Sequence, residues 1–326
     1  MRRRDFISGA GSAIVWPSVA AAQQSALPVI GFLGPGSAQS DAYRVAAFRQ
    51  GLREAGFVED QNCVVVFRWA EGHYDRLPAL ASDLVHQRVA VIVASSLPAS
   101  LAAKAATASI PVVFETAADP VKIGLVASLN RPGGNVTGVS QLNQEVEEKR
   151  LELLHELLPK ASALALLVNP TDPAIAEPQM RAVRLAAEAF GIKLTVLNAS
   201  SEQDFESAFA KLAESQAGGL VIGGDAFFSS HSKQLAALTV QHGVPAIYQW
   251  RDFAAAGGLM SYGANITDTH RLAGIYAGRI LKGDKPSDLP VQRATKIEMY
   301  INLKTAKALG ITVPLPLSGR ADEVFE

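Results

Sequence analysis

The 326-residue chain has little of what marks several classes of protein. Its single cysteine, Cys63, cannot form an internal disulfide and has no metal-binding neighbours, so we interpret it as a buried core thiol. The 30 basic and 31 acidic side chains nearly cancel, so no strong field would attract nucleic acid or anionic lipid. The six histidines never recur at the spacing of metal ligands. We therefore expect no nucleic-acid partner, no metal and no other cofactor.

Motifs of common enzyme classes are also missing. Gly34-Pro35-Gly36 begins like a dinucleotide-binding loop, but the third glycine is absent and the proline removes an N–H that would face phosphate. The chain contains neither the G-x-x-x-x-G-K-[ST] loop of nucleotide hydrolases nor the G-x-S-x-G turn of α/β-hydrolases. A binding protein is therefore favoured over an enzyme.

Long apolar runs are absent, and none approaches the roughly 18 residues of a membrane-spanning helix. The N-terminus instead resembles an export signal, with arginines at 2–4, a mildly apolar stretch, and small residues at 20–22. The run RRDFI at 3–7 resembles the twin-arginine export motif. We predict that residues 1–22 are an export signal cleaved near Ala22, and that the mature protein is periplasmic.

What the chain does contain is an alternation of strand and helix patterns that occurs twice. Short apolar runs alternate with segments whose apolar residues recur at helical spacing. Such runs, each followed by a helix, predict α/β architecture with parallel sheets covered on both faces. Strands are predicted at 28–34, 63–67, 89–94 and 111–114 in the first series, and at 163–168, 194–197, 220–222 and 244–248 in the second.

The two series meet at 116–138, a segment rich in Pro, Gly and Asn that we interpret as a passage between two lobes. Later extended pieces at 257–263 and 296–302 would let the chain return to the first lobe and cross again. About three crossing segments predict a hinge that permits closure. We assign residues 28–138 and about 264–292 to the first lobe, and residues 139–263 and about 293–326 to the second.

Candidate ligand-binding residues follow the predicted strands, because parallel sheets bind ligands beyond the carboxyl ends of their strands. Most are small, polar or aromatic, as a site for a small molecule requires. The same residue types are common in caps and turns, so each one alone has a structural alternative. Asp225 and Glu115 would suit an amino group on the ligand. The predicted ligand-binding residues are Ser37, Ser95, Ser96, Glu115, Thr116, Asn169, Asp225, Phe227 and Tyr248.

Four segments resemble the substrate-binding proteins of ABC transporters. They are RWAEGHYDRLPALASDLV (68–85), TAADPVKIGLVASLNRPGGNVTG (116–138), GVPAIYQWRDFAAAGGLMSYG (243–263) and KIEMYINLKTAKALGITVPLPLSGRADEVFE (296–326). The resemblance implies two Rossmann-like lobes of the type I periplasmic-binding-protein fold. It also implies capture of a small solute, such as an amino acid or an aromatic compound, and delivery to an ABC permease in the inner membrane. We expect a monomer. Relatives often carry proline where this chain has Ala226, which leaves the pose of Asp225 in question.

Two alternatives stay open on the sequence. One is an exported α/β enzyme of the hydrolase kind, which turnover of the bound ligand would reveal. The other is a solute-sensing partner of a receptor, which the sequence does not separate from a transport protein. A permease gene beside this one would favour transport.

Overall fold

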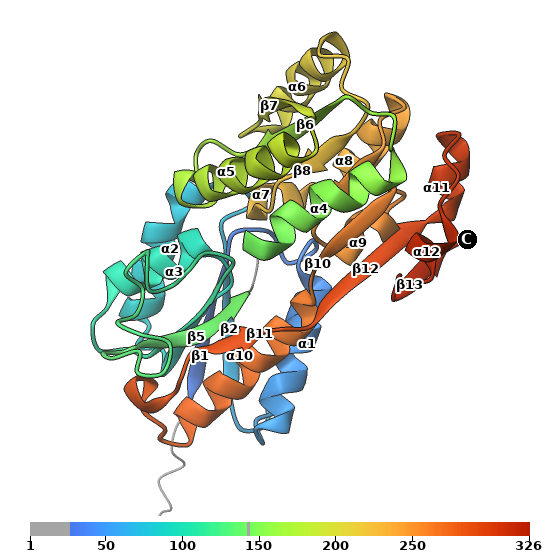
Figure 1. The fold of residues 1–326 in the computed structure, drawn as a ribbon. Coiled ribbons are helices and arrows are strands. Elements are labelled where there is room, and N and C mark those ends of the chain that lie inside the picture. Colours follow the sequence, from blue (N-terminus) through green and yellow to red (C-terminus); the bar gives the residue numbers. More distant parts are fainter. Residues whose placement is uncertain (1–26, 142–143) are drawn as a thin grey trace, which may run out of the picture.

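The computed structural model describes residues 27–141 and 144–326, which form two α/β lobes (Figure 1). The predicted export signal at 1–22 lies outside the described residues. The strands form two sheets, one in each lobe. The two-lobed α/β fold predicted from the sequence is therefore confirmed.

The first lobe is built on a six-stranded sheet in the order β11-β5-β4-β3-β1-β2, in which every neighbouring pair is parallel. Most of it comes from the first 141 residues, and the rest from a later segment of the chain. Its elements are β1 (Val29–Gly34), α1 (Ala42–Glu54), β2 (Val64–Trp69), the 3-10 turn η1 (Tyr74–Arg76), α2 (Leu77–His86), β3 (Val91–Ala94), α3 (Leu97–Ala106), β4 (Val112–Thr116), β5 (Val136–Gln141), α10 (Ile266–Leu281), η2 (Pro286–Asp288) and β11 (Gln292–Ala294).

The second lobe is built on a seven-stranded sheet in the order β13-β12-β10-β9-β8-β6-β7. Its elements are α4 (Gln144–Leu157), β6 (Ala163–Val168), α5 (Pro173–Ala189), β7 (Lys193–Asn198), α6 (Glu202–Glu214), β8 (Leu220–Ile222), α7 (Ala226–Ser230), α8 (Ser232–Gln241), β9 (Ala246–Tyr248), α9 (Arg251–Ala255), β10 (Met260–Ala264), β12 (Ile297–Asn302), α11 (Leu303–Ala308), α12 (Leu315–Ser318) and β13 (Glu323–Phe325).

Two details differ from the expectation. Strand β5 begins inside the segment that the sequence analysis interprets as a passage, so the chain crosses after Gln141. Strands β10 and β12 are antiparallel, whereas parallel pairing was predicted. The chain that joins these two strands, residues 265–296, runs through α10 and β11 of the first lobe, so β12 enters the second sheet from the other lobe and in the opposite direction.

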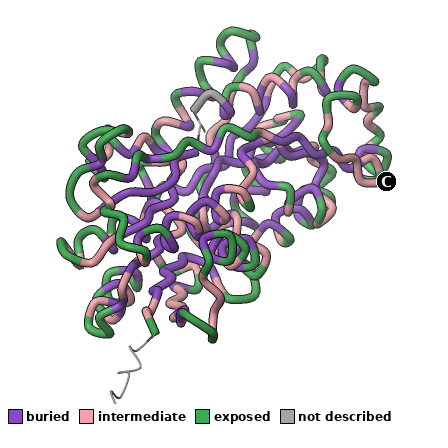
Figure 2. Tube along the Cα trace, turned by 90° about the horizontal axis from the view of Figure 1, so that it is seen from below, coloured by how far each residue is buried: buried purple, intermediate pink, exposed green. Residues whose placement is uncertain are grey.

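The strands are buried because each sheet is covered on both faces. Neighbouring residues on β1 enter different core clusters, Phe32 on one face and Leu33 on the other. The same alternation places Leu166 and Leu167 of β6 in separate clusters of the second lobe. Figure 2 shows the resulting pattern, with buried chain through the interior and exposed chain at the periphery.

Helix α10 returns from the second lobe and packs closely against α1. A Cβ added to Gly51 would lie 1.8 Å from the carbonyl oxygen of Arg271, and one added to Gly274 would lie 2.2 Å from that of Phe48. These separations leave no room for a side chain at either position. The later segment is thus an integral part of the first lobe.

Candidate functional site

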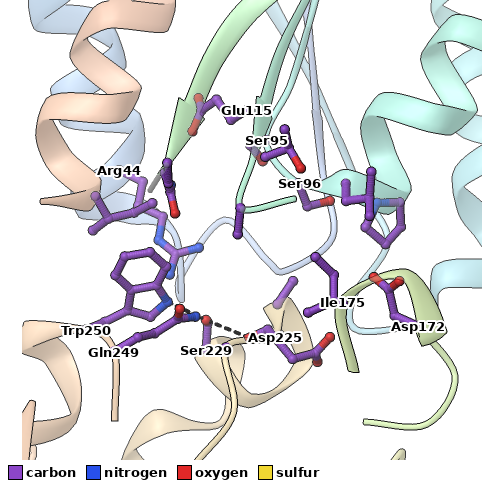
Figure 3. A pocket seen from close by; sticks show the side chains of 18 residues that line it. Arg44, Ser95, Ser96, Glu115, Asp172, Ile175, Asp225, Ser229, Gln249 and Trp250 are labelled. Atoms are coloured by element: carbon purple, nitrogen blue, oxygen red, sulfur yellow. Dashed lines mark hydrogen bonds between the residues drawn. The ribbon is translucent and has the colours of Figure 1, made fainter. Parts of the chain in front are cut away.

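The two lobes enclose a cavity of about 70 Å³ at the carboxyl ends of their strands (Figure 3). This is where open parallel sheets bind ligands. The first lobe contributes residues from α1, from the ends of β3, β4 and β5, and from the start of α10. The second lobe contributes residues that follow β6, β8 and β9. The lining side chains include Arg44, Ser95, Ser96, Glu115, Thr116 and Gln141 from the first lobe, and Asp172, Ile175, Asp225, Ser229, Gln249 and Trp250 from the second.

Three predicted hydroxyl residues line the first-lobe side of the cavity. Ser96 is the N-cap of α3, where its Oγ accepts a hydrogen bond from the N–H of Ala99 at 3.2 Å. Ser95 Oγ lies 3.4 Å from the carbonyl oxygen of Leu33. Thr116 also lines the cavity. These strand ends supply neutral hydroxyl groups to the site.

Asp225 caps the short helix α7 and is held by three donors on one oxygen. Its Oδ1 accepts hydrogen bonds from the N–H of Phe227 at 2.8 Å, from Asn169 Nδ2 at 3.1 Å and from the Tyr74 hydroxyl at 3.2 Å. Burial raises the pKa of Asp225, although these hydrogen bonds act in the opposite direction. Asp225 therefore keeps a fixed pose even with alanine, not proline, at the next position.

Tyr74 joins the two lobes. It belongs to η1 of the first lobe, yet its hydroxyl accepts a hydrogen bond from the N–H of Phe227 at 2.7 Å and donates one to Asp225 at 3.2 Å. Its ring packs against core clusters of both lobes. The structure is thus a closed arrangement in which the lobes contact each other directly.

Asp172 is an acidic group that the sequence analysis does not include. It follows β6 by four residues and is buried at 9% exposure. Burial and the nearby charge of Asp225 raise its pKa to about 6. Figure 3 shows its carboxylate directed toward the first lobe. Two carboxylates from the second lobe therefore lie at one side of the cavity.

Arg44 is the cation on the opposite side, and the sequence analysis also omits it. It lies on α1 with a side chain only 9% exposed. Its Nε donates to the Tyr43 hydroxyl at 2.8 Å, and its Nη1 lies 3.2 Å from Asp41 Oδ1. Figure 3 shows its guanidinium group reaching into the space between the lobes. An anionic group of a ligand would meet this donor.

Glu115 is paired differently from the prediction. One carboxyl oxygen lies 3.0 Å from Nδ1 of His270 on α10, and both residues are almost fully buried. Burial raises the pKa of Glu115 to about 8, while burial and the charge of Arg44 lower the pKa of His270 to about 3. At neutral pH the pair therefore consists of two uncharged groups.

The remaining predicted residues do not line the cavity. Asn169 lies behind it and positions Asp225. Tyr248 is fully buried, and its hydroxyl donates to the carbonyl oxygen of Asp225 at 3.2 Å. Ser37 lines a separate groove, and the Phe227 ring belongs to the core of the second lobe, where it stacks on Phe205.

The described part of the chain contains no group of three or more His, Cys, Asp or Glu residues arranged to hold a metal ion. Within the same residues, no helix combines the length and apolarity needed to cross a membrane. The side chains that line the cavity include hydrogen-bonding groups and charges of both signs.

A family model described as ABC transporter substrate binding protein matches residues 35–325. The chain belongs to this family. Its members are binding proteins and not enzymes, as the sequence analysis expects. The fold is that of the type I periplasmic binding proteins, which LacI-type regulators share.

The chain is similar in sequence to three proteins for which a structure or a binding activity is described. A tyrosine-binding protein of Clostridioides difficile strain R20291 is 28% identical over 262 residues, which cover 80% of this chain and 75% of the relative. A crystal structure of an ABC domain from Streptococcus pneumonia in complex with L-Trp is 26% identical, with a TM-score of 0.83, and covers 92% of this chain and 100% of the other. A conserved domain protein of Vibrio cholerae O1 biovar El Tor is 28% identical, with a TM-score of 0.84, 91% of this chain and 99% of the other being covered.

Proposed function

We propose that this solute-binding protein captures an amino acid between its lobes and delivers it to an ABC permease. The observation that carries the proposal is the opposite charge on the two sides of the cavity. Asp172 and Asp225 of the second lobe suit an ammonium group, and Arg44 with Ser95 and Ser96 of the first lobe suits a carboxylate. The tyrosine-binding and L-Trp-bound relatives support an amino acid as the ligand.

Binding would select the closed state, because only that state offers both charged sides to one molecule. A ligand must favour closure by about 5.5 kcal/mol to change a nearly open population into a nearly closed one. Hydrogen bonds to charged groups contribute roughly 1.5–3 kcal/mol each, so about two to four of them supply this difference.

The proposal includes export to the periplasm. It rests on the arginines at 3–4 and the small residues near Ala22. Replacing both arginines by lysine should leave the full-length precursor in the cytoplasm, whereas the natural chain should be found as a shortened protein in the periplasmic fraction.

Thermal shift of the mature protein tests the ligand class. L-Tyrosine, L-tryptophan and L-phenylalanine should raise the melting temperature in proportion to the logarithm of their concentration above Kd, as mass action requires. Nucleosides, sugars and short peptides should have no effect. Stabilisation by one of these groups without stabilisation by any amino acid would contradict the proposal.

A further inference from the structure

The central cavity is small for the ligands of the relatives. Its volume of about 70 Å³ has room for roughly five to seven water molecules, at about 10–15 Å³ each. The common part of an α-amino acid has about that many non-hydrogen atoms, whereas tyrosine has about a dozen. The side chain of an aromatic amino acid must therefore occupy further space.

A second cavity of about 90 Å³ adjoins the first one. The two share Ala117 and Ile175 in their walls, so these residues form the partition between them. The second cavity also lies between the lobes, with residues after β4 on one side and the first turns of α5 on the other. Its walls are largely apolar, from Ala118, Ile123, Ala174 and Pro178.

Four polar side chains also line this second cavity: Asp119, Lys122, Gln179 and Glu147. Glu147 of α4 lines it and is only 1% exposed. Its Oε1 lies 2.5 Å from Nη2 of Arg150, one turn further along the helix. Oε1 is thus paired with Arg150, whereas Oε2 has no hydrogen-bond donor among the described residues. A buried acceptor in this state is stabilised by any donor that reaches it.

The other neighbouring groove is less suitable for an apolar group. It is larger, about 610 Å³, but it shares only Ser229 with the central cavity. Its walls carry mostly hydroxyl, amide and charged side chains, among them Tyr43, His231, Lys233 and Asp252. An apolar side chain placed in this groove would stay in contact with water and would bury little apolar surface.

We infer that the cavity beyond Ile175 is the side-chain subsite of the same ligand, and that it takes an apolar stem ending in a hydrogen-bond donor that Glu147 accepts. The inference rests on the proposed amino-acid function and adds the class of side chain. A phenol or an indole fits this description. Ile175, which lines both cavities, would change rotamer when the ligand enters and so connect them.

Filling the second cavity tests the inference. Ala174 is exposed in the first turn of α5, so Ala174→Phe should fold normally while its ring occupies the subsite. Titration calorimetry should show at least tenfold weaker binding of both L-tyrosine and L-phenylalanine. The matched control is Ala189→Phe at the exposed end of the same helix, which should bind both within twofold of the natural protein.

Glu147→Gln tests whether Glu147 accepts a hydrogen bond from the end of the ligand side chain. The natural protein should prefer L-tyrosine to L-phenylalanine, and the variant should reduce this preference at least fivefold. A purely structural role would weaken both ligands equally, so the ratio remains informative even if the variant is less stable. Unchanged affinities in Ala174→Phe would overturn the inference while leaving the proposed function intact. If neither amino acid binds the natural protein, the proposed function fails and the inference fails with it.

Discussion

The two lobes share an architecture but differ in what they present to the cleft. The first lobe offers hydroxyl groups at the end of β3 and one cation, Arg44, from a helix. The second lobe offers two carboxylates, Asp172 and Asp225, from the loops after β6 and β8. Since both sheets direct their carboxyl ends to the same space, a few residues after the strands decide the charge of each side. The fold determines where the cleft lies, and these residues determine the charge that each side of it presents.

The strongest way to break this comparison is to remove the cation of the first lobe. Arg44→Gln leaves Asp41 buried without its partner, which should reduce the free energy of unfolding by about 3–5 kcal/mol. Arg49→Gln on the same helix is the control, because its pair with Glu59 is partly exposed and should contribute at most about 1 kcal/mol. Urea unfolding of both variants measures the difference. If both variants lose the same free energy of unfolding, the buried pair of Arg44 with Asp41 contributes no more to stability than the exposed pair of Arg49 with Glu59.

Removing the charge of the second lobe should affect the ligand more than the fold. Asp172→Asn keeps the shape but loses a charge-assisted hydrogen bond, so L-tyrosine and tyramine should bind about 10–100 times more weakly. The deaminated acid 3-(4-hydroxyphenyl)propionate, which lacks the ammonium group, should be unaffected. Calorimetric titrations with the three ligands check this pattern. A similar loss for all of them would place the ammonium elsewhere.

Stability against pH sharpens the comparison at Glu115, which faces His270, Arg44 and Asp41. Its pKa of about 8 lies above the ordinary value, so the folded state binds the proton more tightly than the unfolded state does. Below pH 6.5 the lowered pKa of His270 has the opposite effect, because there the unfolded state binds the proton more tightly and stability rises with pH. Stability should therefore fall between pH 6.5 and 8, by about 1.4 kcal/mol per pH unit at most.

Glu115→Gln should remove most of this decrease. Melting temperatures of both proteins at pH 6.5 and pH 8 provide the measurement. The variant should gain stability relative to the natural protein as the pH rises. A natural protein that is equally stable at both values would mean that Glu115 is already ionised at pH 6.5.

The smallest expected effect concerns the direct contact between the lobes. Tyr74→Phe removes the hydroxyl that binds both Asp225 and the N–H of Phe227, which should favour the open state by about 1 kcal/mol, or roughly fivefold. The radius of gyration of the ligand-free variant should increase in small-angle scattering. Tyr262→Phe in the second lobe serves as the control and should leave the scattering unchanged. The contact is unimportant if the two variants scatter alike.

The sequence predicts the fold well because strand and helix periodicity is strong in both lobes. The strands predicted in the two series are present, with ends within two residues of the predicted ones. Residues directly after a strand, such as Ser95 and Ser96, line the cavity, and their contact with a ligand stays a prediction.

The rest of the site depends on directions that periodicity does not encode. Arg44 lies on a helix whose apolar stripe packs on the sheet, and only the packing of α1 shows that it faces the cleft. Asp172 follows its strand at a greater distance, after a turn. Phe227 follows a strand end too, but its position in α7 turns the ring into the core. An aromatic side chain at such a position can either pack in the core or contact a ligand, and the sequence pattern alone does not distinguish the two.

The return of α10 to the first lobe has a consequence for biosynthesis. Most strands of the first sheet leave the ribosome long before residues 266–281. The sheet face that α10 covers therefore stays exposed until more than a hundred further residues have been synthesised. The second lobe is continuous from residue 144 to residue 264, but it takes β12, α11, α12 and β13 from the far end of the chain. Contacts between distant parts of a chain form slowly. Neither lobe should therefore be complete until the residues after 265 have left the ribosome, and a nascent chain stopped before Asn265 should be a substrate for chaperones.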